Sequence, residues 1–251
     1  MTRSSAAEHL PVDHRSATAP GNQRYAIYFA PADDSPLGQF GASVLRRHSH
    51  NLEPYNNPDL PYDFNNTDLW LSSIKKPAHY GFHATLKAPF ELADGQSAES
   101  LLNDVADFCS HQKTLSLRGL KPRRTRRFDA LAFEHQPEDV HHFANTCVVQ
   151  FEKYRAPLSV ADHQRRHKEQ LSPEQTDYLN RYGYPYVFNQ FNFHMTLSGT
   201  QPDDANGWLQ WLRTIYPLMV SEPPVLDRLS VFHQPDRQTP FVRIAEFCFG
   251  A

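Results

Sequence analysis

The stretch GFHATLKAPF, residues 81–90, returns later in the chain as FNFHMTLSGT, residues 191–200. Both copies contain the word His-x-Thr-Leu. A random order of the same residues is expected to contain about 0.06 such words, given the His, Thr and Leu content of the chain. Two copies therefore indicate an internal duplication rather than coincidence.

Each copy has the alternating pattern of a β-strand with one buried face, because successive side chains of a strand point to opposite faces. The apolar sets are Phe82, Ala84, Leu86 and Ala88 in the first copy, and Phe193, Met195, Leu197 and Gly199 in the second. The opposite faces carry His83, Thr85 and Lys87, and Asn192, His194, Thr196 and Ser198. The pattern predicts two strands that bury their apolar faces and present His and Thr on the other.

The same order of elements follows each copy. After the first come an amphipathic helix opened by Ser97, then the strand-like segments TLSLRGLKP and RFDALAFE. After the second come a helix with Trp208 and Leu212 on one stripe, stopped by Pro217, then VLDRLSVFHQ and PFVRIAEFCF. This order predicts an α+β, bilobal fold in which two pseudo-twofold-related antiparallel sheets, with helices on their outer faces, enclose a central cleft.

The remaining segments complete this plan. Residues 1–23 are expected to be a disordered tail, and residues 24–251 a single bilobal domain with lobe halves built around 80–134 and 190–250. Residues 24–30 are predicted as a strand, and 38–48, 138–155 and 172–182 as helices, the last with Ser172, Pro173 and Gln175 at its start. Residues 51–79 are expected to be mostly a long loop.

Composition narrows the possible classes of protein. The 251-residue chain has a formal net charge of −3, which argues against general nucleic-acid binding and leaves room for a local basic site. Its three cysteines form no CxxC pair, so neither a disulfide framework nor a cysteine zinc site is indicated. Without an apolar run or leader that would indicate a membrane, a cytoplasmic location is expected. We expect no cofactor, no metal and no obligate protein partner.

The two polar faces supply the groups that phosphodiester cleavage requires. One imidazole can activate water while the other protonates the departing oxygen, because the ordinary pKa of histidine lies near neutral pH. Thr85 and Thr196 can donate hydrogen bonds to the non-bridging oxygens of the phosphate. His83, Thr85, His194 and Thr196 are therefore the candidate catalytic residues, and this chemistry requires no metal. Which histidine is the acid stays open.

Two H-x-T-L words on strands of a duplicated fold resemble the 2H phosphoesterase superfamily. The stretches PAHYGFHATLKAPF and RYGYPYVFNQFNFHMTLSG resemble one branch of it, whose genes commonly lie among those for phosphonate degradation. The likeness covers about residues 24–250. It implies a bilobal fold with a central cleft and metal-independent action on cyclic phosphates or 2′,5′ linkages of nucleotides and RNA. The catalytic pairs are carried over onto His83 with Thr85 and His194 with Thr196. In this branch a ribose cyclic phosphate or a nucleotide-like phosphodiester is an expected substrate.

Further substrate contacts are expected at Lys87, Ser198, Tyr28, Arg127 and Arg243. Arg127 belongs to the basic run KPRRTRR, residues 121–127, in a predicted connection between strands. Tyr182, Tyr184 and Tyr186 precede the second copy and could stack on a base or cover the site, but packing of a loop on the body of the protein is the commoner explanation. His163 and His167 have the spacing of a helical metal pair, but we interpret them as exposed side chains because no third ligand is evident.

Two alternatives use the same residues. The cleft could bind a nucleotide or an RNA end without turnover, which makes the protein a binding module rather than an enzyme. It could also join RNA through a 2′,5′ linkage, the reverse of hydrolysis. The expected ligand is in every case a small phosphodiester or nucleotide-like molecule, or an RNA end.

Overall fold

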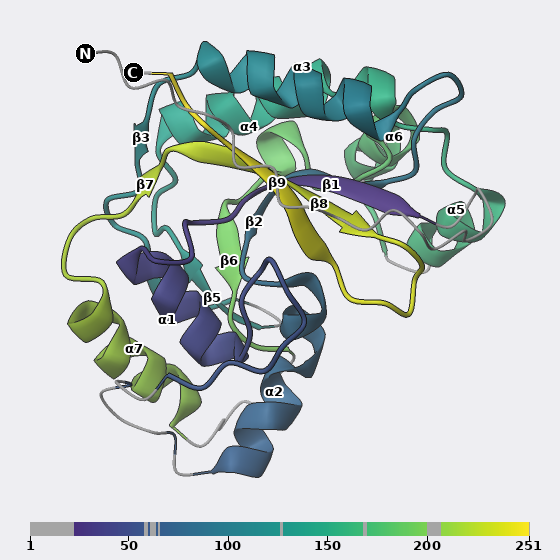
Figure 1. Cartoon of the computed structure of the whole chain (residues 1–251). Helices are drawn as coiled ribbons and strands as arrows, with labels where there is room; N and C mark the ends of the chain where they lie inside the picture. The colour runs from purple at the N-terminus through teal and green to yellow at the C-terminus, as the bar shows by residue number, and fades with distance from the viewer. Residues whose placement is uncertain are drawn as a thin grey trace, which may run out of the picture.

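A seven-stranded antiparallel sheet forms the centre of the protein (Figure 1). The computed structural model describes residues 23–57, 60, 64, 66–125, 128–167, 170–199 and 207–250. The expected disordered tail lies almost entirely outside these residues. In the order in which they neighbour one another, the strands of the sheet are β4 (Lys121–Arg124), β5 (Asp129–Ala132), β6 (His194–Thr196), β2 (Ala84–Phe90), β1 (Arg24–Phe29), β8 (Arg228–Gln234) and β9 (Val242–Cys248). A second, two-stranded sheet pairs β3 (Leu115–Ser116) with β7 (Val225–Leu226).

In Figure 1 α3 and α4 lie above the strands while α1, α2 and α7 gather below them, and residues of all five helices belong to one hydrophobic core. The described helices are α1 (Pro36–Leu45), α2 (Thr67–Tyr80), α3 (Ala98–Ser110), α4 (Glu138–Gln150), α5 (Val160–His167), α6 (Pro173–Tyr182) and α7 (Trp208–Met219), with 3₁₀ turns η1 (Glu152–Tyr154) and η2 (Phe188–Gln190). The α+β prediction with antiparallel sheets is confirmed. Among the described residues, none of the helices has the length and apolar character needed to span a membrane.

In the sheet, each copy of the repeated word lies in the same half as the hairpin that follows the other copy in the sequence. The first copy, β2, lies beside β1, and β1 pairs on its other edge with β8 of the β8–β9 hairpin, which follows the second copy in the sequence. The second copy, β6, lies beside the hairpin β4–β5, which follows the first copy. The two groups of strands meet at β2 and β6, so both His-x-Thr words lie at the centre of one sheet.

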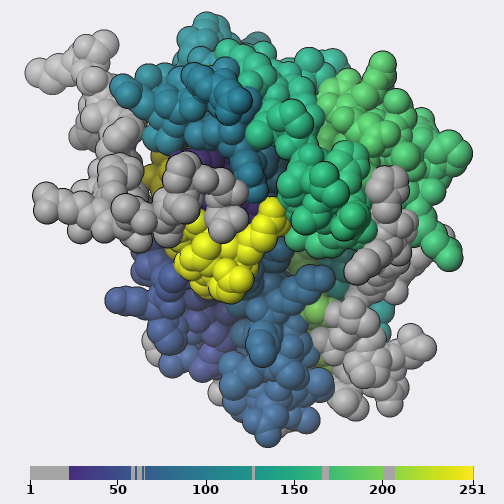
Figure 2. Space-filling view, turned by 90° about the vertical axis from the view of Figure 1, so that its right-hand side faces the viewer, coloured from purple at the N-terminus to yellow at the C-terminus, as the bar shows by residue number. Residues whose placement is uncertain are grey.

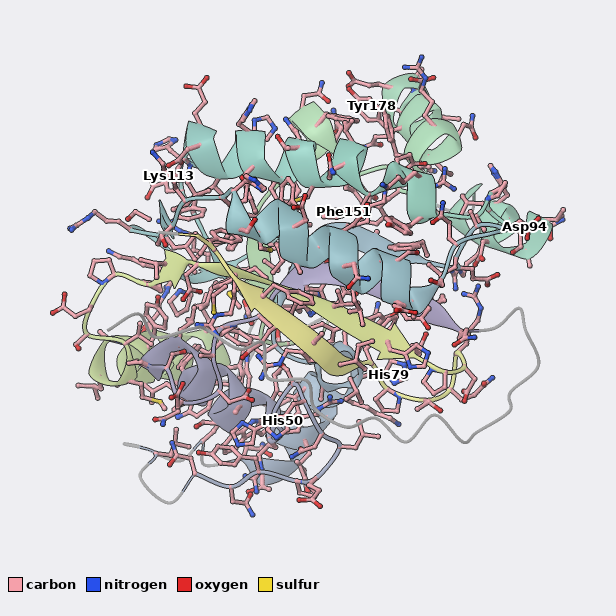
Figure 3. All side chains as sticks on the ribbon, turned by 45° about the horizontal axis from the view of Figure 1, so that its top comes forward. His50, His79, Asp94, Lys113, Phe151 and Tyr178 are labelled. Atoms are coloured by element: carbon pink, nitrogen blue, oxygen red, sulfur yellow. The ribbon has the colours of Figure 1, made fainter. Side chains whose placement is uncertain are left out.

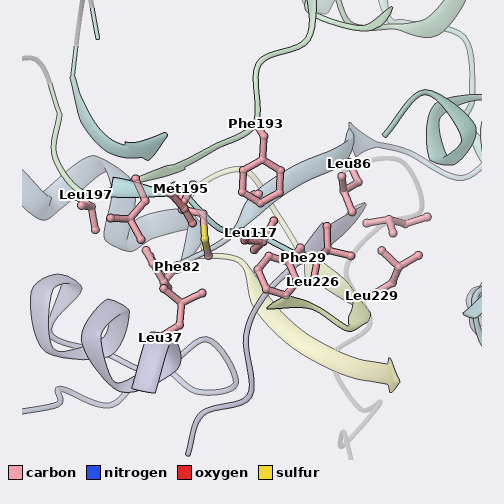
Figure 4. Close-up of a cluster of buried hydrophobic side chains, with 14 of the residues drawn as sticks. Phe29, Leu37, Phe82, Leu86, Leu117, Phe193, Met195, Leu197, Leu226 and Leu229 are labelled. Atoms are coloured by element: carbon pink, nitrogen blue, oxygen red, sulfur yellow. The ribbon is translucent and has the colours of Figure 1, made fainter. Parts of the chain in front are cut away.

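The expected apolar faces of both copies lie in the main hydrophobic core (Figure 4). Phe82 and Leu86 from the first copy and Phe193, Met195 and Leu197 from the second are buried there. Ala88 and Gly199, which the alternation assigns to the same faces, instead line the cleft described below.

The prediction of a long loop over residues 51–79 is wrong for residues 67–79, which belong to α2. Asn66 caps this helix by accepting a hydrogen bond from Leu69 N at 3.0 Å, and Trp70 is buried with its indole N–H on Val44 O at 2.8 Å. The residues just before the helix are rich in Asn, Pro and Asp, which favours a loop, and the apolar stripe of the helix itself is too short to outweigh that signal. Local composition was a poor guide because tertiary burial of one face stabilises the helix.

Pro77 lies inside α2 and has a structural consequence. Proline has no N–H group, so the carbonyl of Ser73, four residues earlier, has no partner within the helix. Gly199 N donates to that carbonyl at 2.7 Å. The carbonyl that Pro77 leaves without a helical partner thus forms the hydrogen bond that connects α2 to the end of the second His-x-Thr copy.

Two other helix ends differ from the sequence prediction. Pro217 does not stop α7, which continues to Met219 with the proline in its last turn. The predicted helix over 138–155 ends as an α-helix at Gln150 and continues as the 3₁₀ turn η1. The predicted start of α6 is confirmed, because Ser172 and Gln175 form a capping box and Gly183 ends the helix in a left-handed conformation.

A β-bulge interrupts the alternation of β2. Tyr28 pairs with Thr85 while the preceding residue of β1, Ile27, pairs with Lys87, so β2 contains one extra residue at Leu86. An extra residue places the next side chain on the opposite face from the one that strict alternation predicts. Lys87 therefore leaves the face of Thr85 and points toward α4.

Candidate functional site

A cleft with a volume of about 600 Å³ contains all four candidate catalytic side chains. His83, Thr85, His194 and Thr196 line its floor. Figure 2 shows the tip of the β8–β9 hairpin, in yellow, lying at the surface next to the blue segment that contains α2. Arg237 from this hairpin tip and Lys76 from α2 both line the cleft.

Sheet register explains why the four side chains meet. Ala84 of β2 and Met195 of β6 are antiparallel partners, and both are fully buried on the core side. The residues on either side of this pair therefore face the cleft. Continuing the register by one residue in each direction places Thr196 opposite His83, and Thr85 opposite His194. A local twofold relation thus passes through the Ala84–Met195 pair, and sheet geometry separates the two histidines by about 7 to 8 Å along the diagonal.

Both imidazoles are anchored in the same way. His83 Nδ1 lies 2.9 Å from the carbonyl oxygen of Gly81, and His194 Nδ1 lies 2.7 Å from that of Asn192, in each case two residues earlier. A carbonyl oxygen only accepts hydrogen bonds, so Nδ1 carries the proton in both rings. The lone pair of each neutral ring is then on Nε2. His83 Nε2 lies 3.2 Å from Thr85 Oγ1.

Gly81 makes the first of these anchors possible. It ends α2 with a φ of 79°, in the region that favours glycine, and turns the chain toward β2. A side chain at this position would approach Ser49 Oγ to 3.3 Å. The same backbone turn at Gly81 therefore ends α2 and places the carbonyl that anchors His83.

Burial keeps both histidines neutral near pH 7. Desolvation lowers the pKa of His83 to about 4, and the Gly81 carbonyl only partly opposes this effect. Desolvation also lowers the pKa of His194, against the opposing hydrogen bond to Asn192. The charge of His194 lowers the pKa of His83 further, so the two rings lie within electrostatic range of each other. The first proton that enters the pair is therefore held by His194.

Tyr28 lies directly against His83. The two rings are stacked with their centroids 3.7 Å apart and an interplanar angle of 17°. Tyr28 also lines the cleft, and burial raises its pKa well above the usual range, so its hydroxyl is neutral and able to donate. The structure thus places this predicted residue in the cleft as a ring that fixes the orientation of His83.

Ser198 lines the cleft but its hydroxyl faces the protein. Ser198 Oγ accepts a hydrogen bond from Asp129 N at 3.0 Å and donates to Gly199 O at 3.1 Å. Asp129 is fully buried and accepts two hydrogen bonds from the Arg124 guanidinium, at 2.7 and 3.1 Å. This network holds the end of β6 against β5, and so positions Thr196.

Lys87 and Arg243 lie outside the cleft lining. The ammonium of Lys87 is buried beneath α4, donates to Val148 O at 2.9 Å and forms an ion pair with Glu152. Arg243 is buried between Asp33 and Glu246, whose Oε2 lies 2.9 Å from its Nη1. The bulge in β2 accounts for the position of Lys87. Arg127 lies outside the residues that the structure describes.

Several cleft residues were not found from the sequence. Arg24 opens β1, lines the cleft, and donates to Gln234 Oε1 from Nε at 2.8 Å. Arg237 pairs with Asp162 of α5 at 2.7 Å, across the outer part of the cleft. Tyr184, by contrast, is one of the tyrosines for which the sequence offered covering of the site as an alternative to packing on the body, and it also lines the cleft. Arg24 and Arg237 are distant in sequence and are brought near each other by the pairing of β1 with β8, so no local pattern marks them.

Comparisons with known proteins give one matching family model and two similar curated proteins. Residues 85–242 match a family model described as protein of unknown function, DUF1045. The chain is 39% identical over 193 residues to ribose 1,5-bisphosphate phosphokinase PhnN of Janthinobacterium sp. (strain Marseille), covering 76% of this chain and 42% of that protein. It is 27% identical over 219 residues to the protein of the same name in Laribacter hongkongensis (strain HLHK9), covering 87% of this chain and 50% of that protein. The chain thus spans about half the length of the curated relatives it matches.

Proposed function

Since the chain belongs to the DUF1045 family of proteins of unknown function, its activity must be inferred from its cleft, and we propose that it is a metal-independent phosphodiesterase. The proposed substrate is a cyclic phosphate or a nucleotide-like phosphodiester. The observation that carries the proposal is the pair of imidazoles, related by a local twofold at Ala84–Met195 and each anchored through Nδ1 in one cleft. Two such rings can act as the base and the acid of one displacement at phosphorus.

The difference between the two histidines supports an assignment of roles. His83 stays neutral down to about pH 4, so it is the base. Its Nε2 takes a proton from water while the water oxygen forms a bond to phosphorus. The ester P–O bond breaks, and the departing oxygen takes the proton from the Nε2 of protonated His194. His194 suits this role because it holds the first proton of the pair.

The two threonines are proposed to hold the phosphate. Thr85 and Thr196 lie opposite His194 and His83 on the same sheet face, so their hydroxyls can donate to the two non-bridging oxygens from both sides. Donors that are already in place stabilise the charge that builds up on these oxygens without having to reorient. In the free protein, Thr85 Oγ1 lies against His83 Nε2 at 3.2 Å, a contact that a bound phosphate would replace.

A ribose phosphate is the substrate class that the relatives favour. Both are named for ribose 1,5-bisphosphate, which supports a role for this chain in the same phosphonate-linked metabolism. The arginines Arg24 and Arg237 at the cleft suit an anionic ligand of this kind. We do not extend the kinase activity to this chain, because about half of each relative lies outside the match and the sequence contains no GxxxxGK[ST] phosphate-binding loop.

The test is a product assay with purified full-length chain and a panel of cyclic phosphates that includes ribose 1,2-cyclic phosphate. Phosphorus NMR shows ring opening and identifies the oxygen that keeps the phosphate. We expect turnover in the presence of excess chelator, and its loss in His83→Ala and in His194→Ala but not in His142→Ala, which removes an exposed histidine on α4.

The outcomes separate the alternatives. Binding of a cyclic nucleotide by calorimetry without any product over hours would favour a binding protein. Joining of RNA ends through a 2′,5′ linkage without net hydrolysis would favour the ligase. Turnover that disappears with chelator and returns with a divalent metal would contradict the metal-independent mechanism.

A further inference from the structure

A second cluster of histidines lies outside the cleft. Asp33, in the turn after β1, faces His48 and His50, in the loop after α1. The ligand atoms of these three side chains all lie within 4.8 Å of one another. Figure 3 labels His50 beside α1. None of the three residues lines the catalytic cleft.

His48 has a buried nitrogen that lacks a hydrogen-bond partner. Its Nδ1 is enclosed by protein and lies 3.9 Å from Asp33 Oδ1, which is too far for a hydrogen bond. A buried polar atom without a partner is costly, and such atoms in native proteins often mark the place of a water or an ion.

His50 approaches the same carboxylate. Its Nδ1 lies 2.6 Å from Asp33 Oδ2, and its ring stacks on that of His48 with centroids 5.4 Å apart. The two Nδ1 atoms therefore converge on the two oxygens of one carboxylate. We propose that Asp33, His48 and His50 form a binding site for a zinc-class divalent transition metal that links the turn after β1 to the loop after α1.

The donor set selects the class of metal. Two imidazole nitrogens and one carboxylate oxygen suit Zn²⁺ and its neighbours Co²⁺ and Ni²⁺, whereas Mg²⁺ and Ca²⁺ prefer oxygen ligands throughout. Zinc–ligand distances are about 2.0 to 2.2 Å for these atoms, so an ion at the centre of the cluster requires only small side-chain movements. Three protein ligands leave a fourth position for water.

The surroundings orient the carboxylate. Arg243 forms an ion pair with Asp33 through Oδ2, and Glu246 offsets the charge of the guanidinium with its Oε2 at 2.9 Å. Oδ1 is thereby left facing His48. Hydrogen bonds to a ligating carboxylate fix its position and are typical of metal sites.

Metal binding needs one change of tautomer. Asn51 Nδ2 lies 3.0 Å from His50 Nε2, which implies that the His50 proton is on Nδ1 and points at Asp33 in the metal-free protein. A metal at Nδ1 moves that proton to Nε2, and the amide of Asn51 must rotate to accept it. The rotation gives up the 3.2 Å hydrogen bond from Glu53 N to Asn51 Oδ1. This cost is small beside the bonds of a bound metal.

The site lies behind the first catalytic copy. Ser49, between the two histidines in the sequence, places its hydroxyl 3.4 Å from Phe82 O and packs against Gly81. A metal that fixes residues 48–50 therefore supports the backbone that anchors His83, without contacting the substrate. Its expected effect is on stability rather than on the chemical step.

Calorimetric titration of Zn²⁺ into tag-free, metal-free full-length protein tests the proposal. We expect one site in the wild type, about 100-fold or more weaker in His48→Ala. Binding should be unchanged in the exposed-histidine control His142→Ala and in the double variant His83→Ala/His194→Ala, which removes the cleft histidines. Mg²⁺ should not bind. Saturating Zn²⁺ should also raise the Tm of the wild type by about 5 °C but not that of His48→Ala.

Opposite results overturn the site. Absence of Zn²⁺ binding to the wild type, or equal affinity in His48→Ala, contradicts it, and a loss confined to the cleft double variant assigns the ion to the catalytic histidines instead. Should His48→Ala fail to fold by circular dichroism, His50→Ala, with its more exposed ring, gives the same comparison. Because the main readout is binding, a protein without phosphodiesterase activity can still pass this test.

Discussion

His83 stacks on Tyr28 with ring centroids 3.7 Å apart, whereas His194 lies 5.3 Å from the Phe128 ring at a tilt of 39°. The two copies are otherwise alike, since each ring is anchored through Nδ1 to a carbonyl two residues earlier. The strands differ as well, because β2 has seven residues and β6 has three.

The comparison teaches that two copies of one motif can differ in proton affinity because their surroundings differ. The duplicated backbone supplies position, and the unequal neighbours supply unequal proton affinity. A symmetric pair of histidines would share a proton and assign no direction to the reaction. The closer packing around His83 favours its neutral form and leaves the first proton on His194.

Removal of either imidazole is expected to have the largest effect on activity. His83→Ala and His194→Ala should each lower kcat by about 10²-fold or more, because the proposed displacement needs both a general base and a general acid. Steady-state kinetics on the best cyclic phosphate measures the loss, with circular dichroism to confirm folding. An active single variant would show that one copy suffices.

Removing one hydroxyl tests the threonines next. Thr85→Val and Thr196→Val keep the shape of the side chain and should each lower kcat by about 10- to 100-fold, since each loses one donor to the charged phosphate. KM should change less than kcat. The corresponding change Thr146→Val, in a threonine of α4 whose hydroxyl donates to His142 O, is the matched control and should leave the kinetics unchanged.

The pH profile sharpens the assignment of roles. The proposed mechanism requires His83 to be neutral, which holds above about pH 4, and His194 to be protonated, which holds below a pKa that burial lowers from 6.5. We therefore expect kcat/KM to peak between about pH 4 and 6.5 and to fall about tenfold per unit above the pKa of His194. A profile that rises steadily to pH 8 would contradict the assignment.

The aromatic neighbours allow a smaller test. Tyr28→Leu removes the stacked ring, so the pKa of His83 should rise toward 6.5 and the acid limb of kcat/KM should move up with it. The rate at pH 6 should fall about fivefold. Phe128→Leu should change the profile less, because its ring lies farther from His194. NMR titration of the histidine resonances measures both shifts.

Lys87 gives the smallest expected effect on catalysis. Strict alternation puts it beside Thr85, while the bulge puts it beneath α4 with Glu152. Lys87→Met should leave kcat/KM within about twofold and lower the Tm by a few degrees, because removal of one partner from a buried ion pair is destabilising. A large loss of activity at unchanged Tm would contradict this structural role and indicate that Lys87 contacts the substrate.

The elements with strong local signals could be predicted from the sequence. The cap of α6 at Ser172 and the strand faces around His83 and His194 follow from patterns within a few residues. The class of the fold follows from their order. Helix α2 could not be predicted, because its cap and apolar stripe are short and the burial of Trp70 depends on α1 and α7.

The remainder of the site depends on long-range pairing. Arg24 enters the cleft because β1 pairs with β8, more than two hundred residues later, and the bulge that diverts Lys87 is a mismatch between two strands that neither strand encodes alone. Alternation rules assume regular pairing, so they fail at such an irregularity. The exchange of hairpins between the two copies is likewise visible only in the strand order.

The most direct test of the account is a crystal structure of the full-length chain with phosphate or vanadate bound in the cleft. The account predicts one anion that accepts hydrogen bonds from the Nε2 atoms of both His83 and His194, with Thr85 and Thr196 on its remaining oxygens. An anion bound by only one histidine, or held elsewhere in the cleft while the two rings face different spaces, would contradict it.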